Sequence, residues 1–584
     1  MAKLVNSNHI PFVVLLFIAF GFQAYGVPYD DSITTDCLST PLSAHYGGGM
    51  VVNPELNEGL NGWTAFGDAK IAHAASEDGN KFIVAYERKR PSHSFAQTFN
   101  LEKDKLYTFS AWVQMSDGKA DVAAVFKTKT RYEVAGWAPA NKSCWTMLKG
   151  GLAPKTSGPA HLYFETEGKA DVWADSISLQ SFTHQEWESH QQERIKKVRQ
   201  QKLRIQVVDR NGQPIPNAKV SLKQTRRKFP FGCAINKNIL YNPKYQSWFL
   251  HRFNYATFEN ELKWYSTESK RGVEDYRIPD CMIKFLETNG IGARAHNLLW
   301  EDQKYQPYWV PGLSQSELWK AVRKRMKSVV RRYEGKFIQW DVMNENLHSS
   351  FFESRLNYNA ASTYFYDHVH KLDPRATPCL NDFNTIEEPT DSQSSPYKYK
   401  NKIDEMRAQG YKGRLVIGLE GHFSYDRVNL PYIRASIEYL TTSLKLPIWI
   451  TELDLTDGPN RAQLLDQIIR ELYAHKYVRG IVLWASLSDS GCYRMCLTDY
   501  KYNNLDTGNV VDQFIKELKH KDVLDSPATT DSNGFFEASL YHGDYQVQAI
   551  HSNGTQVSKL IQVAPSRKRK TTTTTRIHRL TLDV

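Results

Sequence analysis

Two short stretches, WDVMNEN at residues 340–346 and ITELDL at residues 450–455, decide the fold of this chain. Both carry the apolar and β-branched residues of a buried strand and end in carboxyl or amide side chains. Six similar runs lie between residues 231 and 487, separated by longer amphipathic stretches: FGCAI, YATFENE, IGARAHNLLW, TPCLNDFN, RLVIGLEGH and GIVLWASL. Eight strand-then-helix units over 227–522 predict a (β/α)8 TIM barrel. An open α/β sheet usually has a glycine-rich turn after its first strand, and FGCAIN has none.

The region before the barrel has a different pattern. Residues 47–182 contain short alternating runs such as KLYTFSAWVQ, separated by turn residues, and predict a β-sandwich of the jelly-roll type. Residues 183–202 are polar, with charged residues at helical spacing, and predict a solvated helical linker.

Two further segments flank the barrel. Residues 203–226 and 527–565 alternate apolar and polar residues and contain Asn-Gly or His-Gly turn signals. We expect them to be two halves of one small, discontinuous β-sandwich into which the barrel is inserted, because isolated hairpins are marginally stable in water. Two independent hairpins packed on the barrel are the alternative. The remaining residues, 566–584, form a basic, Thr-rich tail that we expect to be at least partly mobile.

The N-terminus indicates a secreted protein. Residues 1–26 join a weakly positive start, a short apolar stretch and small residues, which is typical of a signal peptide. Seven cysteines follow, and in an oxidising compartment Cys37–Cys144 and Cys492–Cys496 are plausible pairs. Asn141 and Asn553 begin glycosylation sequons. We therefore expect an extracellular or cell-wall protein with no membrane segment after cleavage.

Composition excludes several classes. The chain has 584 residues, 41% hydrophobic and 12% aromatic, with a net charge of +11. This is globular composition, so fibrous and disordered classes are excluded, and the length suggests about three or four domains. The basic clusters lie in no nucleic-acid-binding signature, so we expect no nucleic-acid partner, and we expect a monomer.

The polar strand ends point to glycosidic bond cleavage. A TIM barrel places reactive groups at the carboxyl ends of its strands, where Glu345 and Glu452 stand. Cleavage needs one protonated carboxyl as acid and one ionised carboxylate, and in a retaining enzyme the second attacks the anomeric carbon. The negative charge of one would raise the pKa of the other. Asn344 could hold a sugar hydroxyl.

These motifs together resemble glycoside hydrolase family 10, the retaining endo-β-1,4-xylanases, with plant-type members most similar. The resemblance implies that Glu345 is the acid/base and Glu452 the nucleophile, with no catalytic cofactor and no metal in the barrel. It implies supporting roles for Asn344, for His422 on the nucleophile and for Asp454 in orienting that histidine. It also implies these substrate-binding residues: Glu259, Asn260, Lys263, His296, Trp300, Glu420 and Trp484.

Three positions depart from the family pattern. Glu301 stands where a second histidine is usual, Glu420 stands for the usual glutamine, and the loop after Trp484 lacks a further tryptophan, for which Tyr493 could substitute. A carboxylate at Glu420 would raise the pKa of Glu452 unless it is itself neutralised.

The N-terminal β region, from GMVVNPELNEGLNGW, resembles carbohydrate-binding module family 22. The resemblance implies a xylan-binding groove, for which Trp112, Tyr163 and Glu165 are candidates. It also implies a structural calcium ion with Asp175 and Glu55 as candidate ligands.

The combined interpretation is a secreted endo-xylanase that acts on xylan and xylo-oligosaccharides. Two alternatives remain open at this point. The same residues could transfer the glycosyl group to another sugar, or a weakly active barrel could serve a xylan-binding wall protein.

Overall fold

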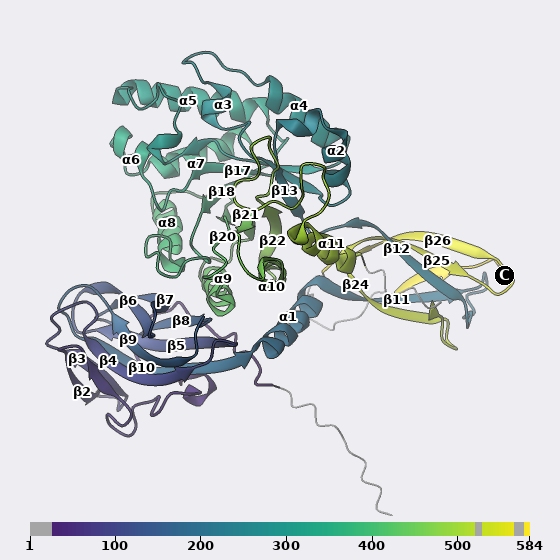
Figure 1. The fold of residues 1–584 in the computed structure, drawn as a ribbon. Helices are drawn as coiled ribbons and strands as arrows, with labels where there is room; N and C mark the ends of the chain where they lie inside the picture. Colours follow the sequence, from purple (N-terminus) through teal and green to yellow (C-terminus); the bar gives the residue numbers. More distant parts are fainter. Residues whose placement is uncertain (1–25, 520–527, 566–576, 584) are drawn as a thin grey trace, which may run out of the picture.

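The computed structural model describes residues 26–519, 528–565 and 577–583, so all but one residue of the predicted signal peptide lies outside it. Three bodies follow one another in space: an N-terminal β-sandwich, a barrel ringed by helices, and a small second sandwich (Figure 1). None of the helices within these described ranges combines the length and apolar character needed to cross a membrane.

The N-terminal module is a sandwich of two five-stranded antiparallel sheets with one core between them. A short 3₁₀ helix, η1 (His45–Gly48), precedes it. The first sheet runs in the order β1 (Thr64–Phe66), β4 (Ser94–Leu101), β9 (Gly158–Glu165), β6 (Lys119–Lys127) and β7 (Tyr132–Asn141). The second runs in the order β2 (Lys70–Ala75), β3 (Lys81–Tyr86), β10 (Val172–Thr183), β5 (Lys105–Met115) and β8 (Thr146–Leu152). Both predicted disulfides, Cys37–Cys144 and Cys492–Cys496, are present.

The helix α1 (His184–Arg199) corrects the prediction of a solvated linker. Its first turn is closed by a capping box between Thr183 and Glu186. Trp187 is 1% exposed and its indole N–H donates to Glu471 of the barrel at 2.8 Å. The linker reads as polar along the sequence, but its few apolar residues form one face that packs on the barrel.

The predicted barrel is confirmed. Eight parallel strands close on one another in the order β13 (Phe231–Ile235), β14 (Tyr255–Phe258), β15 (Gly292–Ala295), β17 (Gln339–Asn344), β18 (Thr377–Asp382), β19 (Val416–Leu419), β21 (Ile448–Leu455) and β22 (Val478–Leu483). Two further strands of two residues each lie at the carboxyl end of the barrel: β16 (Leu299–Trp300), which pairs with β17, and β20 (His422–Phe423), which pairs with β21. Nearly every residue in these strands is buried, as expected for parallel strands covered on both faces.

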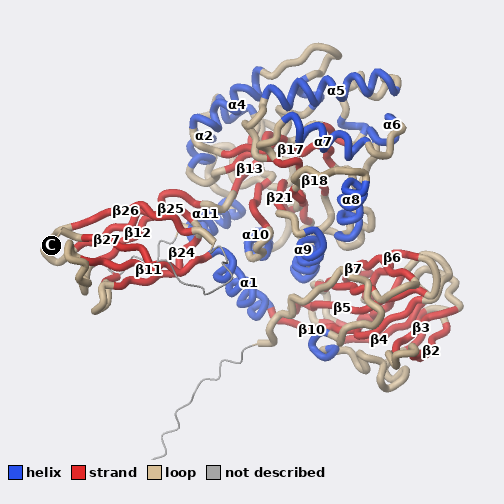
Figure 2. Tube along the Cα trace, turned by 180° about the vertical axis from the view of Figure 1, so that it is seen from behind, coloured by secondary structure: helices blue, strands red, loops and turns tan. Residues whose placement is uncertain are grey.

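Helices surround the barrel strands in both views (Figures 1 and 2). They are η2 (Lys237–Leu240), α2 (Pro243–Leu250), α3 (Trp264–Thr267), α4 (Arg277–Thr288), η3 (Gln303–Tyr305), α5 (Gln315–Arg332), α6 (Phe351–Leu356), α7 (Ala361–Leu372), α8 (Pro396–Ala408), α9 (Leu430–Leu444), α10 (Arg461–Tyr473) and α11 (Asp506–Leu518).

The flanking segments share one sandwich, as the fold prediction proposed. One sheet has the order β24 (Phe535–Tyr541), β11 (Gln200–Val208), β27 (Ile577–Thr581), and the other has the order β23 (Ala528–Thr529), β12 (Lys219–Arg227), β25 (Gly543–Ile550), β26 (Gln556–Val563). The strand β27 lies within the segment that we assigned to a tail. It pairs in parallel with β11, and Leu580 is 2% exposed in the shared core. Because residues 566–584 have a low-complexity composition, the sequence analysis did not predict this strand.

The N-terminal sandwich contacts the barrel at α9, which packs on β8 and β5, at α8, which contacts β7, and at the loop after β18. The Lys149 ammonium pairs with Glu438 at 3.1 Å, and both side chains are almost fully buried. The Trp137 indole donates to the carbonyl of Pro389 at 2.8 Å. These contacts hold the module beside the loop that follows the fifth barrel strand.

Candidate active site

Glu345 and Glu452 both lie at the carboxyl end of the barrel. Glu345 directly follows β17 and has φ of 59°, a left-handed conformation that glutamate rarely adopts. Its backbone N–H donates to the carbonyl of Asn381 at 2.9 Å, and its carbonyl accepts from the N–H of Ser349. Such conformations persist where surrounding contacts fix them, and they cluster at functional sites.

The two carboxyl groups have opposite protonation behaviour. Burial raises the pKa of Glu345, the negative charges of Asp382 and Glu452 raise it further, and the result is about 7. Burial alone would also raise the pKa of Glu452, but His296, His422 and Lys263 lower it to about 2. Near pH 5 the first group is therefore protonated and the second ionised, which is the pairing that glycosidic cleavage requires.

A residue that we did not single out, Asn381, connects the site. Its amide nitrogen lies 2.9 Å from Glu452 Oε1, 2.9 Å from Asn344 Oδ1 and 3.1 Å from Glu420 Oε1. Its own oxygen accepts from the Thr451 hydroxyl, which fixes the amide orientation. Asn381 is the last residue but one of the fifth strand, in the run TPCLNDFN, so the strand-end rule that found Glu345 could have found it too.

Glu420 is 2% exposed and lies against the nucleophile candidate. It shares two donors with Glu452, because Asn381 and His422 reach both carboxyl groups. Burial raises the pKa of Glu420 well above its ordinary value, and the negative charges of Glu452 and Glu345 raise it further. Glu420 is thus the protonated member of this pair, and it leaves Glu452 ionised.

His422 and Asp454 form an ion pair behind the nucleophile candidate. His422 Nδ1 lies 3.0 Å from Asp454 Oδ2, and Nε2 lies 3.6 Å from Glu452 Oε2. Burial would lower the pKa of His422, but Asp454 and Glu452 raise it to about 10. On the other side, His296 Nδ1 lies 3.6 Å from Glu452 Oε1 and 3.0 Å from Asp341. Two imidazole rings therefore flank one carboxylate.

Aromatic side chains and a cation form the surface around these groups. The Lys263 ammonium lies 4.6 Å from the Trp300 ring and 5.8 Å from the Trp484 ring. Lys263 also donates to Asn260 Oδ1 at 3.3 Å. A cavity of about 680 Å³ opens beside them, lined in part by Glu259, Asn260 and Tyr493. Polar groups and one aromatic ring, that of Tyr493, line this cavity, and such a lining suits a sugar chain.

Glu301, one of the departures from the family pattern, is 1% exposed and is hydrogen-bonded to the segment that follows β17. Its carboxylate accepts from the N–H of Phe352 at 2.9 Å and from Asn346 at 3.3 Å, and burial raises its pKa to about 8. Glu301 therefore supports the chain after β17.

The sequence analysis did not predict a second group of titratable side chains at the carboxyl end of the barrel. His348 bridges the buried Asp382 and Asp391, with its nitrogens 2.6 and 2.9 Å from their oxygens. Burial would lower the pKa of His348, but the two carboxylates raise it to about 10. His348 and Asp391 lie in loops, where the sequence carries no periodic signal.

One cluster among the described residues has the spacing of metal ligands: Glu420, His422 and Glu452, whose ligand atoms lie within 4.8 Å of one another. These atoms already contact Asn381 and one another. The three side chains thus form one network of hydrogen bonds and ion pairs with Asn381.

In the N-terminal module, Tyr163 and Glu165 lie together on the outer face of the first sheet. The Tyr163 hydroxyl donates to Glu165 at 3.0 Å, and the Tyr163 ring stacks on Phe66 with centroids 4.3 Å apart. Trp112 does not join them, which corrects the candidate groove. Trp112 and Tyr163 are both 2% exposed, but Trp112 lies on β5 of the other sheet, in a cluster with Trp145.

Comparison with known proteins agrees with this geometry. The profile described as "Glycosyl hydrolase family 10" matches residues 221–525, which is 305 of 584 residues, and the profile described as "Carbohydrate binding domain" matches residues 48–175. The Arabidopsis thaliana protein "Endo-1,4-beta-xylanase 5" is 37% identical over 555 residues, covering 94% of each chain. "Endo-1,4-beta-xylanase 5-like" from the same plant is 40% identical and covers 81% of this chain and 83% of its own.

Solved structures also match. Xylanase 10B from Thermotoga petrophila RKU-1 in complex with xylobiose is 21% identical, with a TM-score of 0.44, over 50% of this chain and 94% of its own.

Proposed function

The chain belongs to glycosyl hydrolase family 10, and we propose that it is a secreted endo-β-1,4-xylanase that cleaves xylan with retention. The observation that carries the proposal is the pair Glu345 and Glu452, whose pKa values of about 7 and about 2 separate an acid from a nucleophile. The relatives named endo-1,4-beta-xylanase support the choice of substrate.

The proposed reaction has two steps. In the first, an oxygen of Glu452 attacks the anomeric carbon, the glycosidic bond breaks, and Glu345 gives its proton to the leaving oxygen. In the second, water attacks the glycosyl ester, gives a proton to Glu345, and Glu452 leaves as a carboxylate. The negative charge of Glu452 raises the pKa of Glu345, so its loss in the ester lowers that pKa and turns Glu345 into a base.

The surrounding residues have supporting roles in this proposal. His422, with Asp454 behind it, and Asn381 hold Glu452 in place. Trp300 and Trp484 supply stacking surfaces, while Asn344, Glu259, Asn260, Lys263 and His296 bind sugar hydroxyls.

The test is a product time-course on xylohexaose with the wild type and with Glu452→Ala. We expect shorter xylo-oligomers from the wild type alone, and proton NMR should show the β anomer forming first, as retention requires. The matched control is Glu301→Gln, which changes a buried carboxyl that is hydrogen-bonded to the segment after β17 and should keep activity. Activity in Glu452→Ala would contradict the nucleophile assignment.

Two other product patterns would change the function. Products longer than xylohexaose would indicate transglycosylation. No products, with xylan binding retained, would indicate a xylan-binding wall protein.

We also propose a structural calcium ion in the N-terminal module. Burial and the charge of Glu55 raise the pKa of Asp175 to about 7, and the Ser176 hydroxyl lies 3.4 Å from Glu55. A buried carboxyl group and a half-buried one on either side of Ser176 fit a hard cation, which would neutralise both.

Secretion and glycosylation complete the proposal. The two disulfides support an oxidising compartment. Asn553 is exposed and Asn141 partly exposed, so both sequons are accessible to glycosylation.

A further inference from the structure

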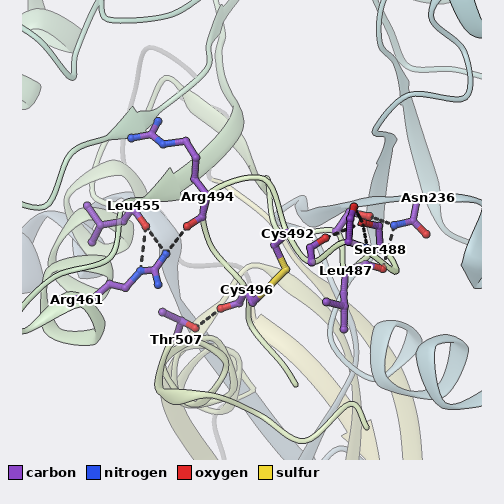
Figure 3. The surroundings of a disulfide bond; sticks show 12 residues. Asn236, Leu455, Arg461, Leu487, Ser488, Cys492, Arg494, Cys496 and Thr507 are labelled. Atoms are coloured by element: carbon purple, nitrogen blue, oxygen red, sulfur yellow. Dashed lines mark hydrogen bonds between the residues drawn. A yellow bond between two sulfur atoms is a disulfide. The ribbon is translucent and has the colours of Figure 1, made fainter. Parts of the chain in front are cut away.

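The loop between β22 and α11 is fixed at several points (Figure 3). The Cys492–Cys496 disulfide closes five residues of it. The Arg461 guanidinium donates to the carbonyl of Leu455 at 2.6 Å and to the carbonyl of Arg494 at 2.7 Å. The Thr507 hydroxyl donates to the carbonyl of Cys496 at 2.6 Å. The backbone around Arg494 is therefore held from both sides.

Two neighbouring side chains of this loop, Tyr493 and Arg494, point in different directions: one toward the cavity and one toward the buried Asp454. The Tyr493 side chain is 65% exposed, lines the large cavity and lies 5.7 Å, ring to ring, from His422. The Arg494 side chain is 21% exposed and turns inward, where Nη2 donates to the carbonyl of Phe423 at 2.7 Å. Its Nη1 lies 3.2 Å from Asp454 Oδ1.

Asp454 is thus held through both oxygens. Its Oδ1 faces Arg494 and its Oδ2 faces His422 at 3.0 Å. The carboxylate is fully buried, and a buried charge needs fixed, complementary partners. Because the two partners take different oxygens, they fix the rotation of the carboxylate and hence the aim of His422 toward Glu452.

We propose that Arg494, clamped by the disulfide loop, is a positioning residue that orients the Asp454–His422 pair on the nucleophile. The inference rests on the proposed function of Glu452. Its chemistry is an unbroken chain of contacts, from the Arg494 guanidinium through Asp454 and His422 to the Glu452 carboxylate.

The charges around the two ends of this chain determine its pH behaviour. Glu452 is faced by His296, His422, Lys263, Arg294, Glu345 and Glu420. Asp454 is faced by His422, Arg494, Arg461 and the Tyr493 hydroxyl. His422 is among the groups that lower the pKa of Glu452, so a misaligned His422 should raise that pKa.

The first test compares Arg494→Met, Arg494→Lys and the control Arg331→Met, which changes an exposed arginine of α5. For Arg494→Met on xylohexaose we expect kcat to fall about tenfold, KM to stay unchanged and the acidic limb of kcat to move up by about one pH unit. Arg494→Lys should recover much of kcat, and Arg331→Met should match the wild type. If Arg494→Met does not fold, Arg494→Gln takes its place.

A second readout needs no turnover. In histidine-labelled protein, the downfield imidazole proton of the His422–Asp454 pair, identified by its absence in His422→Asn, should persist in Arg494→Lys and be lost or shifted in Arg494→Met. An unchanged signal and an unchanged pH profile in Arg494→Met would overturn the proposal. A wild type that cleaves nothing would refute the proposed function alone, because the imidazole signal would still report on Arg494.

Discussion

Replacing Glu420 with glutamine should stabilise the protein relative to the wild type, and this difference should grow as the pH rises. Burial and neighbouring carboxylates raise the pKa of Glu420 well above the ordinary value of 4.5, so the folded state keeps its proton where the unfolded state has lost it. The folded state binds more protons, so above about pH 4.5 this group reduces stability by about 1.4 kcal/mol per pH unit until its own pKa is reached. Glutamine has the same shape and does not titrate.

The magnitude follows from that slope. Between two pH values above about 4.5 at which folded Glu420 keeps its proton, the free energy of unfolding of Glu420→Gln should rise relative to the wild type by about 1.4 kcal/mol for each pH unit. The other carboxyl groups cancel in this difference, because neutral Glu420 and neutral glutamine place no charge beside them. Activity should remain near the wild-type level, since Glu452 keeps its contacts with Asn381 and His422.

The assay is urea unfolding followed by tryptophan fluorescence at both pH values. Glu334→Gln, which changes an exposed carboxyl on the barrel surface, is the control and should show no such trend. If the difference between Glu420→Gln and the wild type does not change with pH, Glu420 is ionised in the folded state and our account of the carboxyl pair fails.

Three further predictions concern other parts of the molecule. Glu345→Ala should lower xylan cleavage by about 10²–10⁴-fold but spare aryl xylosides with good leaving groups, and in the wild type the alkaline limb should lie near the Glu345 pKa of about 7. Glu165→Ala should weaken retention on insoluble xylan in a pull-down assay while xylohexaose cleavage stays unchanged; equal losses would assign Glu165 a structural role. In calorimetry, the N-terminal module should be about 3 kcal/mol less stable with a chelator than with calcium at a concentration about a hundredfold above its Kd. Asp175→Asn should abolish that difference.

Periodicity and strand-end chemistry predicted the barrel and its two central carboxyl groups. The eight strands are short buried runs, so their pattern is local and visible in the sequence. Glu345 and Glu452 stand out because charged groups at the end of a buried strand are costly without a function.

Long-range pairing was not predictable in the same way. Trp187 and Arg434 both reach Glu471, and the three residues come from three separate helices, so no window of sequence contains the contact. The fate of Glu420 likewise depends on which of several carboxyl groups keeps its proton, and only their spatial arrangement decides this.

The discontinuous sandwich has a consequence for biosynthesis. Ile205 on β11 pairs with Phe536 on β24, and 536 minus 205 is 331 residues. At a translation rate of about 5–20 residues per second, β11 emerges from the ribosome roughly 15–70 s before its partner exists. During that interval it presents an unpaired, half-apolar edge to the surrounding compartment. The barrel is therefore synthesised while β11 and β12, the first half of the second sandwich, are still unpaired with the second half. A chaperone that shields β11 during this time should raise the yield of intact protein.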